Sequence, residues 1–299
     1  MDRRTQLGRY LITLSLAASS LAVFATPAQA TFPGTNGKIA YSGNVDGDFE
    51  IYVVAPAGGA STKLTNNSFD DADPAFSASG QLIYWDQELA SGKHVIMVMH
   101  ANGTQQRRLT PTSKDSWDPT PGPDGEVAFV RTIGGNSEIF VMNANGTDAR
   151  QLTDTGRYAD EPAWSPDGRT IAFVRSFHYY SAVFTMTAQG RHKIAITPAD
   201  ADYYDPSFSP DGTHIAVDSD LSTLSDIYTM TVTGSDITQI TSTAGHQILP
   251  RYSPDGTSIS YSTDDSGYME IVTKPLGGGP ETPLTTDGAT NNNGSWGSV

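Results

Sequence analysis

Four carboxylates stand directly before a proline at nearly equal intervals along the chain. They are Asp73, Asp118, Glu161 and Asp205, and their spacing of about 44 residues is typical of a repeat fold. Like charges gathered at one place need compensation, either by raised pKa values or by a bound cation with oxygen ligands such as Ca²⁺. The four residues are therefore candidate Ca²⁺ ligands. The structural alternative is that each side chain bonds to the backbone of its own turn, as Asp commonly does.

Aromatic and histidine side chains occur in the same loops. Aromatic rings suit a sugar or a protein partner equally, and His178 and His246 belong to different repeats without a zinc-ligand spacing or a neighbouring nucleophile. We predict a binding surface rather than a catalytic constellation. Its candidate residues are Asp73, Trp117, Asp118, Tyr158, Asp160, Glu161, His178, Tyr203, Tyr204, Asp205 and His246.

The elements that must position these residues come from six copies of one repeat. Each copy has a turn, a strand of alternating apolar and polar residues, an apolar strand, a second turn, and a short strand that closes on Leu-Thr or Ile-Thr. Such a unit cannot bury its faces alone. The sequence predicts an all-β, six-bladed β-propeller with four-stranded antiparallel blades. If strands A to D run outward from the axis and strand A follows each proline, the four carboxylates ring the mouth of the axial channel.

The two ends of the chain complement each other. The first recognisable strand, at Lys38, corresponds to the second strand of a blade, and the last segment, 294–298, aligns with first strands such as 162–166. The C-terminal strand is therefore predicted to complete the first blade. Such a clasp leaves no open sheet edge in the ring.

The turn sequence Ser-Pro-Asp-Gly at 165–168, 209–212 and 253–256, each followed by Ile-Ala or Ile-Ser, resembles the repeat of the TolB-like β-propellers. The resemblance extends over the whole chain after residue 30. It implies the propeller fold and, by analogy of fold, an exported, non-enzymatic binding module of the cell envelope or the extracellular space.

Residues 1–30 have the pattern of a signal peptide. Arginines precede an apolar stretch from Leu11 to Phe24, and Ala28 and Ala30 provide the small residues that a signal peptidase reads. We expect the propeller to occupy residues 31–299, with no membrane span after cleavage, in the periplasm or outside the cell. The sequence leaves open whether export is by the general or the twin-arginine route.

The protein is strongly acidic, with a net charge of −15 over the full chain. Loss of residues 1–30 removes three Arg and one Asp, which brings the charge to about −17. A surface of this charge repels phosphate backbones, so nucleic acid is excluded as a partner and a basic protein or peptide is expected. The chain has no Cys, which excludes disulfides and thiol chemistry. We expect a monomer.

Two classes of function remain. The first is the binding module, which uses the acidic, aromatic loop face and the channel mouth. The alternative is a propeller enzyme of the glycan lyase, glycan hydrolase or lactonase type, in which a channel metal or a His or Tyr residue moves the proton.

We predict that neither class includes a serine or cysteine hydrolase, because the chain has no Cys and no Gly-x-Ser-x-Gly motif. The purified protein should not react with a fluorophosphonate probe under conditions that label a known serine hydrolase. Stoichiometric labelling of one serine, located by mass spectrometry, would show the prediction to be wrong.

Overall fold

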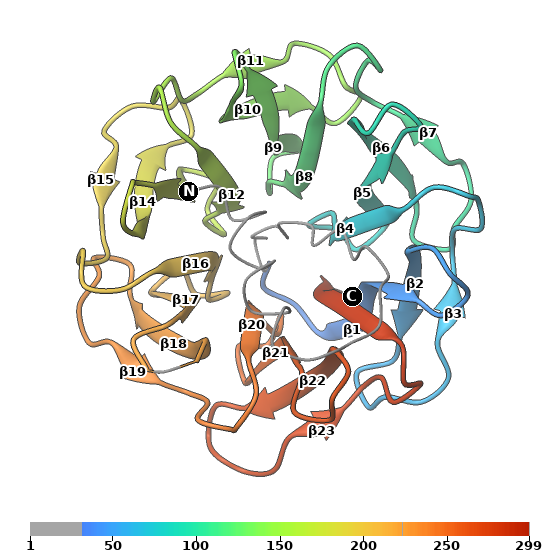
Figure 1. The fold of residues 1–299 in the computed structure, drawn as a ribbon, viewed down its shortest axis with the longest axis vertical. Coiled ribbons are helices and arrows are strands. Elements are labelled where there is room, and N and C mark those ends of the chain that lie inside the picture. The colour runs from blue at the N-terminus through green and yellow to red at the C-terminus, as the bar shows by residue number, and fades with distance from the viewer. Residues whose placement is uncertain (1–31, 223, 299) are drawn as a thin grey trace.

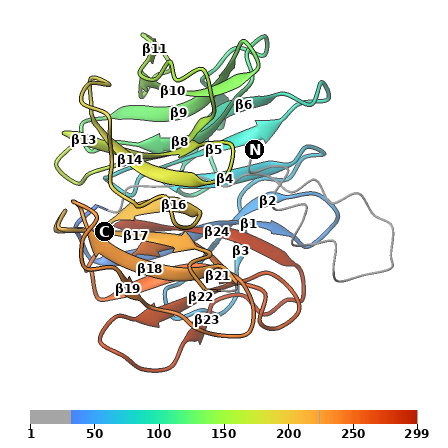
Figure 2. The ribbon, with the colours of Figure 1, turned by 60° about the vertical axis from the view of Figure 1, so that its left-hand side comes forward.

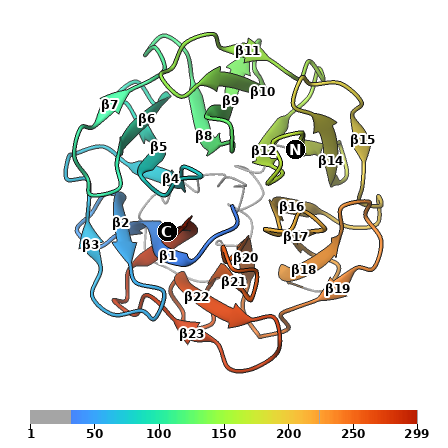
Figure 3. The ribbon, with the colours of Figure 1, turned by 180° about the vertical axis from the view of Figure 1, so that it is seen from behind.

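The protein is a ring of six small sheets around a central axis. A computed structural model describes residues 32–222 and 224–298, and within them each sheet has four antiparallel strands (Figure 1 and Figure 3). The prediction of a six-bladed propeller is confirmed. No helix long and apolar enough to cross a membrane occurs in these two ranges. The predicted signal peptide, 1–30, lies outside the described residues.

Strands A and B form the inner half of each blade. In blades 1 to 6, strand A is β24 (Thr290–Ser298), β4 (Asp71–Phe76), β8 (Ser116–Pro121), β12 (Ala159–Trp164), β16 (Tyr203–Phe208) and β20 (Gln247–Tyr252). Strand B is β1 (Asn36–Asn44), β5 (Leu82–Glu88), β9 (Glu126–Ile133), β13 (Thr170–Ser176), β17 (His214–Ser219) and β21 (Ser258–Thr263).

Strands C and D form the outer half. Strand C is β2 (Glu50–Val54), β6 (His94–His100), β10 (Asn136–Asn143), β14 (Ser181–Thr187), β18 (Asp226–Thr231) and β22 (Glu270–Pro275). Strand D is a two-residue segment at the rim, namely β3 (Thr62–Lys63), β7 (Arg107–Arg108), β11 (Arg150–Gln151), β15 (Ile194–Ala195), β19 (Thr238–Gln239) and β23 (Thr282–Pro283). Short edge strands give other chains little backbone to pair with.

The recurring Leu-Thr or Ile-Thr pair ends each blade by binding strand C twice. In blade 3, the Leu152 N–H donates to the Ile139 carbonyl at 2.8 Å, and the Thr153 hydroxyl accepts the Ile139 N–H at 2.8 Å. The same hydroxyl contact recurs in the other blades, through Thr65, Thr110, Thr197, Thr241 and Thr285. The buried threonine thus satisfies a backbone donor that the short strand D leaves without a ladder partner.

The C-terminal strand closes the ring as the sequence predicted. Strand β24 pairs antiparallel with β1, with Trp296 opposite Ile39, and the two lie side by side in Figure 2. The Ser295 hydroxyl also accepts the N–H of Phe76 in blade 2 at 3.2 Å. The last strand therefore joins its own blade to the next one.

The innermost strands begin earlier than predicted, and each contains a bulge. Strand β4 starts at Asp71 rather than after Pro74, and β24 starts at Thr290 rather than Gly294. The register shifts in the middle of each of these strands, as between Ala72 and Ala75. The residue before each proline, or before Gly294, has a positive φ of 52° to 63°. A bulge with one left-handed residue lets the strand continue through this point, so the proline does not mark the strand start.

Deleting residues 290–299 should lower the free energy of unfolding by several kcal/mol, because it removes an innermost strand and exposes the edge of β1. Urea unfolding followed by circular dichroism measures the change. Tyr268→Ser, a substitution on an exposed loop, is the control and should have little effect. An unfolding midpoint unchanged by the deletion would contradict the clasp.

Candidate functional site

The candidate site lies on one face of the ring. Because strands alternate in direction, the B-to-C hairpins and the D-to-A loops emerge on the same face, which we call the acidic loop face. The described residues of the hairpins are 45–49, 89–93, 134–135, 177–180, 220–222 with 224–225, and 264–269, and the loops span 64–70, 109–115, 152–158, 196–202, 240–246 and 284–289. Within the described residues, most of the charged side chains in these segments are carboxylates.

The four carboxylates before the prolines do not lie open at a channel mouth. Asp73, Asp118, Glu161 and Asp205 are each at most 2% exposed, because they occupy the bulges within strand A rather than the loops before it. Leu249 and Asn293 hold the same position in the other two blades and are equally buried. The expectation of an exposed ring is wrong. The structure instead buries a ring of polar groups below the acidic loop face.

Five of the six bulges donate a backbone N–H to the blade before them. The N–H groups of Asp73 and Asn293 donate to Ser42 and Ser262 of the preceding blades at 3.1 and 3.3 Å. The Asp205 N–H donates to the Glu161 carboxylate at 2.7 Å. The sequence analysis left open a bond between each side chain and the backbone of its own turn. The Glu161 carboxylate instead accepts a hydrogen bond from the next blade.

The buried carboxylates shift one another's protonation. Burial raises the pKa of Asp118 well above its ordinary value, and the charge of Glu161 adds to the effect. Burial likewise raises the pKa of Asp73, with further contributions from Asp86 and Asp118. Raised pKa values were one of the two forms of compensation that the sequence allowed.

A buried guanidinium supplies the positive charge among these carboxylates. Arg251 of β20 is 1% exposed, and it donates to the Pro250 carbonyl at 2.7 Å and to the Asn293 side chain at 3.2 Å. Burial lowers the pKa of Arg251, whereas the charges of Asp205 and Asp118 oppose that shift. One Oδ atom of Asp118 and the Nε of Arg251 have no hydrogen-bond partner among the described residues.

The sequence analysis missed Arg251, although the repeats contain a signal for it. The same position two residues after the bulge is held by small residues in the other blades, namely Ala75, Thr120, Ala163, Ser207 and Ser295. Arg251 replaces them in the blade where Leu249 takes the place of a carboxylate. When two nearby positions of one blade both differ from the other copies of the repeat, they indicate a contact between those residues and another part of the fold.

A second layer of buried charge surrounds the ring. The imidazole of His94 lies 2.7 Å from a carboxylate oxygen of Asp86, and both side chains are buried. The other oxygen of Asp86 accepts the Asp118 N–H at 3.4 Å. Asp218 does the same for the Leu249 N–H at 3.2 Å. The sequence analysis assigned no role to these residues.

The geometry gives no metal centre in the part of the chain that the structure describes. Nowhere in that part do three His, Asp or Glu side chains come together so that they could hold a metal ion. The Ca²⁺ assignment to Asp73, Asp118, Glu161 and Asp205 therefore stays a prediction of the sequence. The positive charge of Arg251 compensates part of the negative charge for which the sequence analysis had suggested a bound cation.

Three of the predicted aromatic site residues belong to the core. Trp117, Tyr203 and Tyr204 are at most 9% exposed and pack between neighbouring blades. They lie in β8 and β16 rather than in loops, because these strands begin two or more residues before their prolines. Their expected exposure on the loop face is wrong, and they act by supporting that face.

The remaining predicted residues do reach the loop face. His178 is exposed in the hairpin of blade 4, while Tyr158, Asp160 and His246 are half-buried. The imidazole of His178 contacts the ring of Tyr179 edge to face, with centroids 4.3 Å apart. The His246 N–H donates to Asp264 at 2.6 Å. The two histidines thus lie on different blades, as expected.

Carboxylates also fix the hairpins to the loops. One oxygen of Asp70 accepts the N–H of Phe49 at 2.8 Å, and Asp115 and Asp202 accept the equivalent N–H groups of His94 and Ser181. In the three blades the two residues are separated by the same distance in sequence. These three acidic residues therefore have a structural role.

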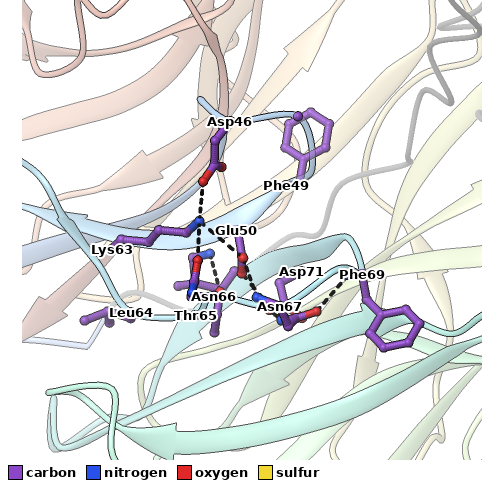
Figure 4. Close-up of polar contacts among 12 residues, drawn as sticks. Asp46, Phe49, Glu50, Lys63, Leu64, Thr65, Asn66, Asn67, Phe69 and Asp71 are labelled. Atoms are coloured by element: carbon purple, nitrogen blue, oxygen red, sulfur yellow. Dashed lines mark hydrogen bonds and ion pairs between the residues drawn. The ribbon is translucent and has the colours of Figure 1, made fainter.

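Blade 1 shows how densely this framework is bonded (Figure 4). Lys63 lies between Asp46 at 2.8 Å and the buried Glu50 at 3.3 Å. Asn67 donates its backbone N–H to Glu50 and its side chain to Asp71, both at 2.7 Å. Burial raises the pKa of Asp71 to about 7, against the effect of its hydrogen bonds from Trp85 and other donors.

Comparison with known proteins agrees with this architecture. The sequence matches the TolB β-propeller domain family over residues 18–206 and 181–298. An uncharacterized protein of Agrobacterium fabrum is 31% identical over 91 residues, which is 30% of this chain and 31% of that protein. The match thus spans about a third of the relative's length.

Solved structures share the fold at low sequence identity. TolB from Acinetobacter baumannii superposes with a TM-score of 0.78 at 17% identity, over 88% of this chain and 67% of that one. Oligogalacturonate lyase from Vibrio parahaemolyticus gives a TM-score of 0.60 at 12% identity, over 86% and 77% of the two chains. An oligogalacturonate lyase in complex with manganese gives 0.60 at 13% identity, over 85% and 75%. These similarities establish the fold.

Replacing Arg251 with Met should cost about 3–5 kcal/mol of unfolding free energy at neutral pH, because it leaves buried carboxylates without their counter-charge. The loss should be small below about pH 4, where carboxylates are protonated in both states, and should grow as the pH rises through the raised pKa of Asp118, whose ionised form Arg251 favours. Urea unfolding at several pH values measures it.

The matched control is Arg150→Met, which breaks the surface ion pair with Glu126 and should cost about 1 kcal/mol or less. A loss for Arg251→Met that is equally large at acid and neutral pH would contradict the electrostatic role of Arg251.

Proposed function

The chain belongs to the TolB β-propeller domain family, and from this premise we propose that it is an exported binding module that holds a basic protein or peptide on its acidic loop face. The proposal includes export to the periplasm or the extracellular space after loss of residues 1–30. The export part of the proposal is supported by the signal-peptide pattern of residues 1–30.

The observation that carries the proposal is the charge of the acidic loop face. Its hairpins and loops bear Asp46, Asp48, Asp70, Asp115, Asp154, Asp200, Asp202, Asp220, Asp264, Asp265 and Asp287, against the basic residues Lys93, Lys114 and Arg157. Such an excess of one sign raises the encounter rate with a partner of the opposite sign and favours it over others.

The predicted site residues contribute to this surface in two ways. His178, Tyr158, Asp160 and His246 are accessible to a partner to different degrees. The buried set holds the blades in register beneath them, namely Asp73, Trp117, Asp118, Glu161, Tyr203, Tyr204 and Asp205. A face supported in this way changes little on binding, which lowers the entropy cost of association.

The enzyme alternative stays a prediction of the sequence. A glycan lyase, glycan hydrolase or lactonase would need an acid-base group beside the substrate, and the candidate histidines His178 and His246 lie on different blades. The solved lyases share the fold at 12–13% identity, and function does not follow from fold at that level.

Neutralising two carboxylates of the acidic loop face should weaken capture of a partner. Asp48 and Asp154 suit the test because neither carboxylate takes part in the hydrogen bonds and ion pairs of the framework described above. Immobilised Asp48→Asn/Asp154→Asn protein should retain less of a basic partner from an envelope extract than the unsubstituted protein, and the difference should shrink as salt rises. Quantitative mass spectrometry of the eluates measures both effects.

Asp236→Asn is the control, because Asp236 is exposed on a C-to-D turn of the opposite face and its positive φ of 57° suits Asn equally. If capture is the same for all three proteins, or falls as much for Asp236→Asn, the acidic loop face is not the binding surface.

A further inference from the structure

Large apolar side chains are exposed mainly on the acidic loop face. Eight such residues are exposed in the described part of the chain, and six of them belong to this face. Those six are Val45, Phe69, Ile133, Tyr179, Leu221 and Tyr268, and the other two, Ile194 and Ile237, lie at the outer rim. Exposed apolar residues scattered singly need no explanation, and these six share one face of the ring without forming a continuous patch in sequence.

Five of the six residues lie in or directly beside the same hairpin of the repeat, Ile133 as the last residue of β9. Val45, Ile133, Tyr179, Leu221 and Tyr268 each lie at the B-to-C hairpin of a different blade, in blades 1, 3, 4, 5 and 6. We call these five residues the hairpin crown. Blade construction does not require an apolar residue there, because a hairpin tip is solvated and packs no core.

The two crown hairpins that carry tyrosines, in blades 4 and 6, are held in place by their neighbours. In blade 4, the rings of Phe177 and Tyr180 stack with centroids 4.7 Å apart, and the guanidinium of Arg175 lies 5.0 Å from the Phe177 centroid. Tyr179, at the tip of the same hairpin, is 89% exposed. In blade 6, the Gly245 and His246 N–H groups donate to Asp265 and Asp264 of the hairpin.

In three of the five blades, carboxylates of the acidic loop face lie close in sequence to the crown residue. Val45 precedes Asp46, Asp220 precedes Leu221, and Asp264 and Asp265 share a hairpin with Tyr268. An apolar tip beside a carboxylate complements a surface in which apolar side chains are bordered by Lys or Arg. A second copy of this chain lacks that complementarity, because its own loop face is acidic.

We propose that the hairpin crown is the apolar part of the docking surface, and that its occupant is a polypeptide whose contact surface combines apolar side chains with Lys or Arg. The inference rests on the proposed function and specifies the surface chemistry of the partner that the protein binds. The carboxylates speed encounter and exclude anionic partners, while rigid aromatic tips that become buried slow dissociation.

Two synthetic peptides of equal positive charge separate these contributions. One is an amphipathic helix of Leu and Lys, and the other contains Lys only. The full-length mature protein should bind the Leu-Lys peptide more tightly than the Lys-only peptide, as measured by fluorescence anisotropy. Tyr179→Ser/Tyr268→Ser should weaken binding of the Leu-Lys peptide by about tenfold or more and leave the Lys-only peptide unaffected.

Ile194→Ser/Ile237→Ser is the matched control, because it removes two equally apolar, exposed side chains from the rim. It should leave the affinity for both peptides unchanged. Equal affinity for the two peptides, or equal losses for the crown and rim variants, would overturn the inference while leaving the charge-based function intact. Absence of binding to both peptides would overturn the inference as well, with the proposed function still decided by the capture experiment.

Two other occupants of the crown, a second copy of the chain and a lipid surface, are tested with the same variant. Light scattering reports self-association, and flotation with phosphatidylcholine–phosphatidylglycerol vesicles reports membrane binding. Dimers or vesicle binding that disappear in Tyr179→Ser/Tyr268→Ser would assign the crown to a second copy or to a lipid surface, and would overturn the proposal. A monomer that stays off the vesicles supports it.

Discussion

A backbone bulge with one left-handed residue, repeated in all six innermost strands, is the constraint on which the rest of the structure depends. The positive φ favours Asp and Asn, which adopt this conformation more readily than other residues with a side chain. Four of the six positions are Asp or Asn, whereas Glu161 and Leu249 are the exceptions. Local conformation therefore accounts for much of the acidic character that first drew attention to these positions. The N–H of the bulge also binds the preceding blade, so the same residue turns the strand and joins the ring.

Placing carboxylates at the bulges creates an electrostatic problem at the axis. Burial raises the pKa values of Asp73 and Asp118, and the guanidinium of Arg251 opposes the charge that remains. Buried ion pairs add little net stability compared with apolar packing, but an unpaired charge costs a great deal. Arg251 thus supplies the positive charge that the buried carboxylates near it require. The buried groups at the axis thus have a structural role, and under the proposed function a partner contacts the loops above them.

The acidic loop face combines two properties that usually conflict. Loops are commonly mobile, yet here Asp70, Asp115 and Asp202 bind hairpin N–H groups, and blade 1 adds the network of Figure 4. Fixed hairpins present charge and apolar tips without a large cost in conformational entropy.

The sequence by itself determined the repeat, the six blades, the turns and the clasp between β1 and β24. These features follow from period-two patterning, turn residues and a half-unit at each end, all of which are local. Only the tertiary structure decided that Asp118 and Tyr203 are buried, that Arg251 lies among the carboxylates, and that Val45, Tyr179 and Tyr268 share one face. The reason is that exposure at the axis depends on side chains from several blades, which lie far apart in sequence. The period of the repeat fixes where each blade goes, whereas the residues that depart from it meet only when the ring closes.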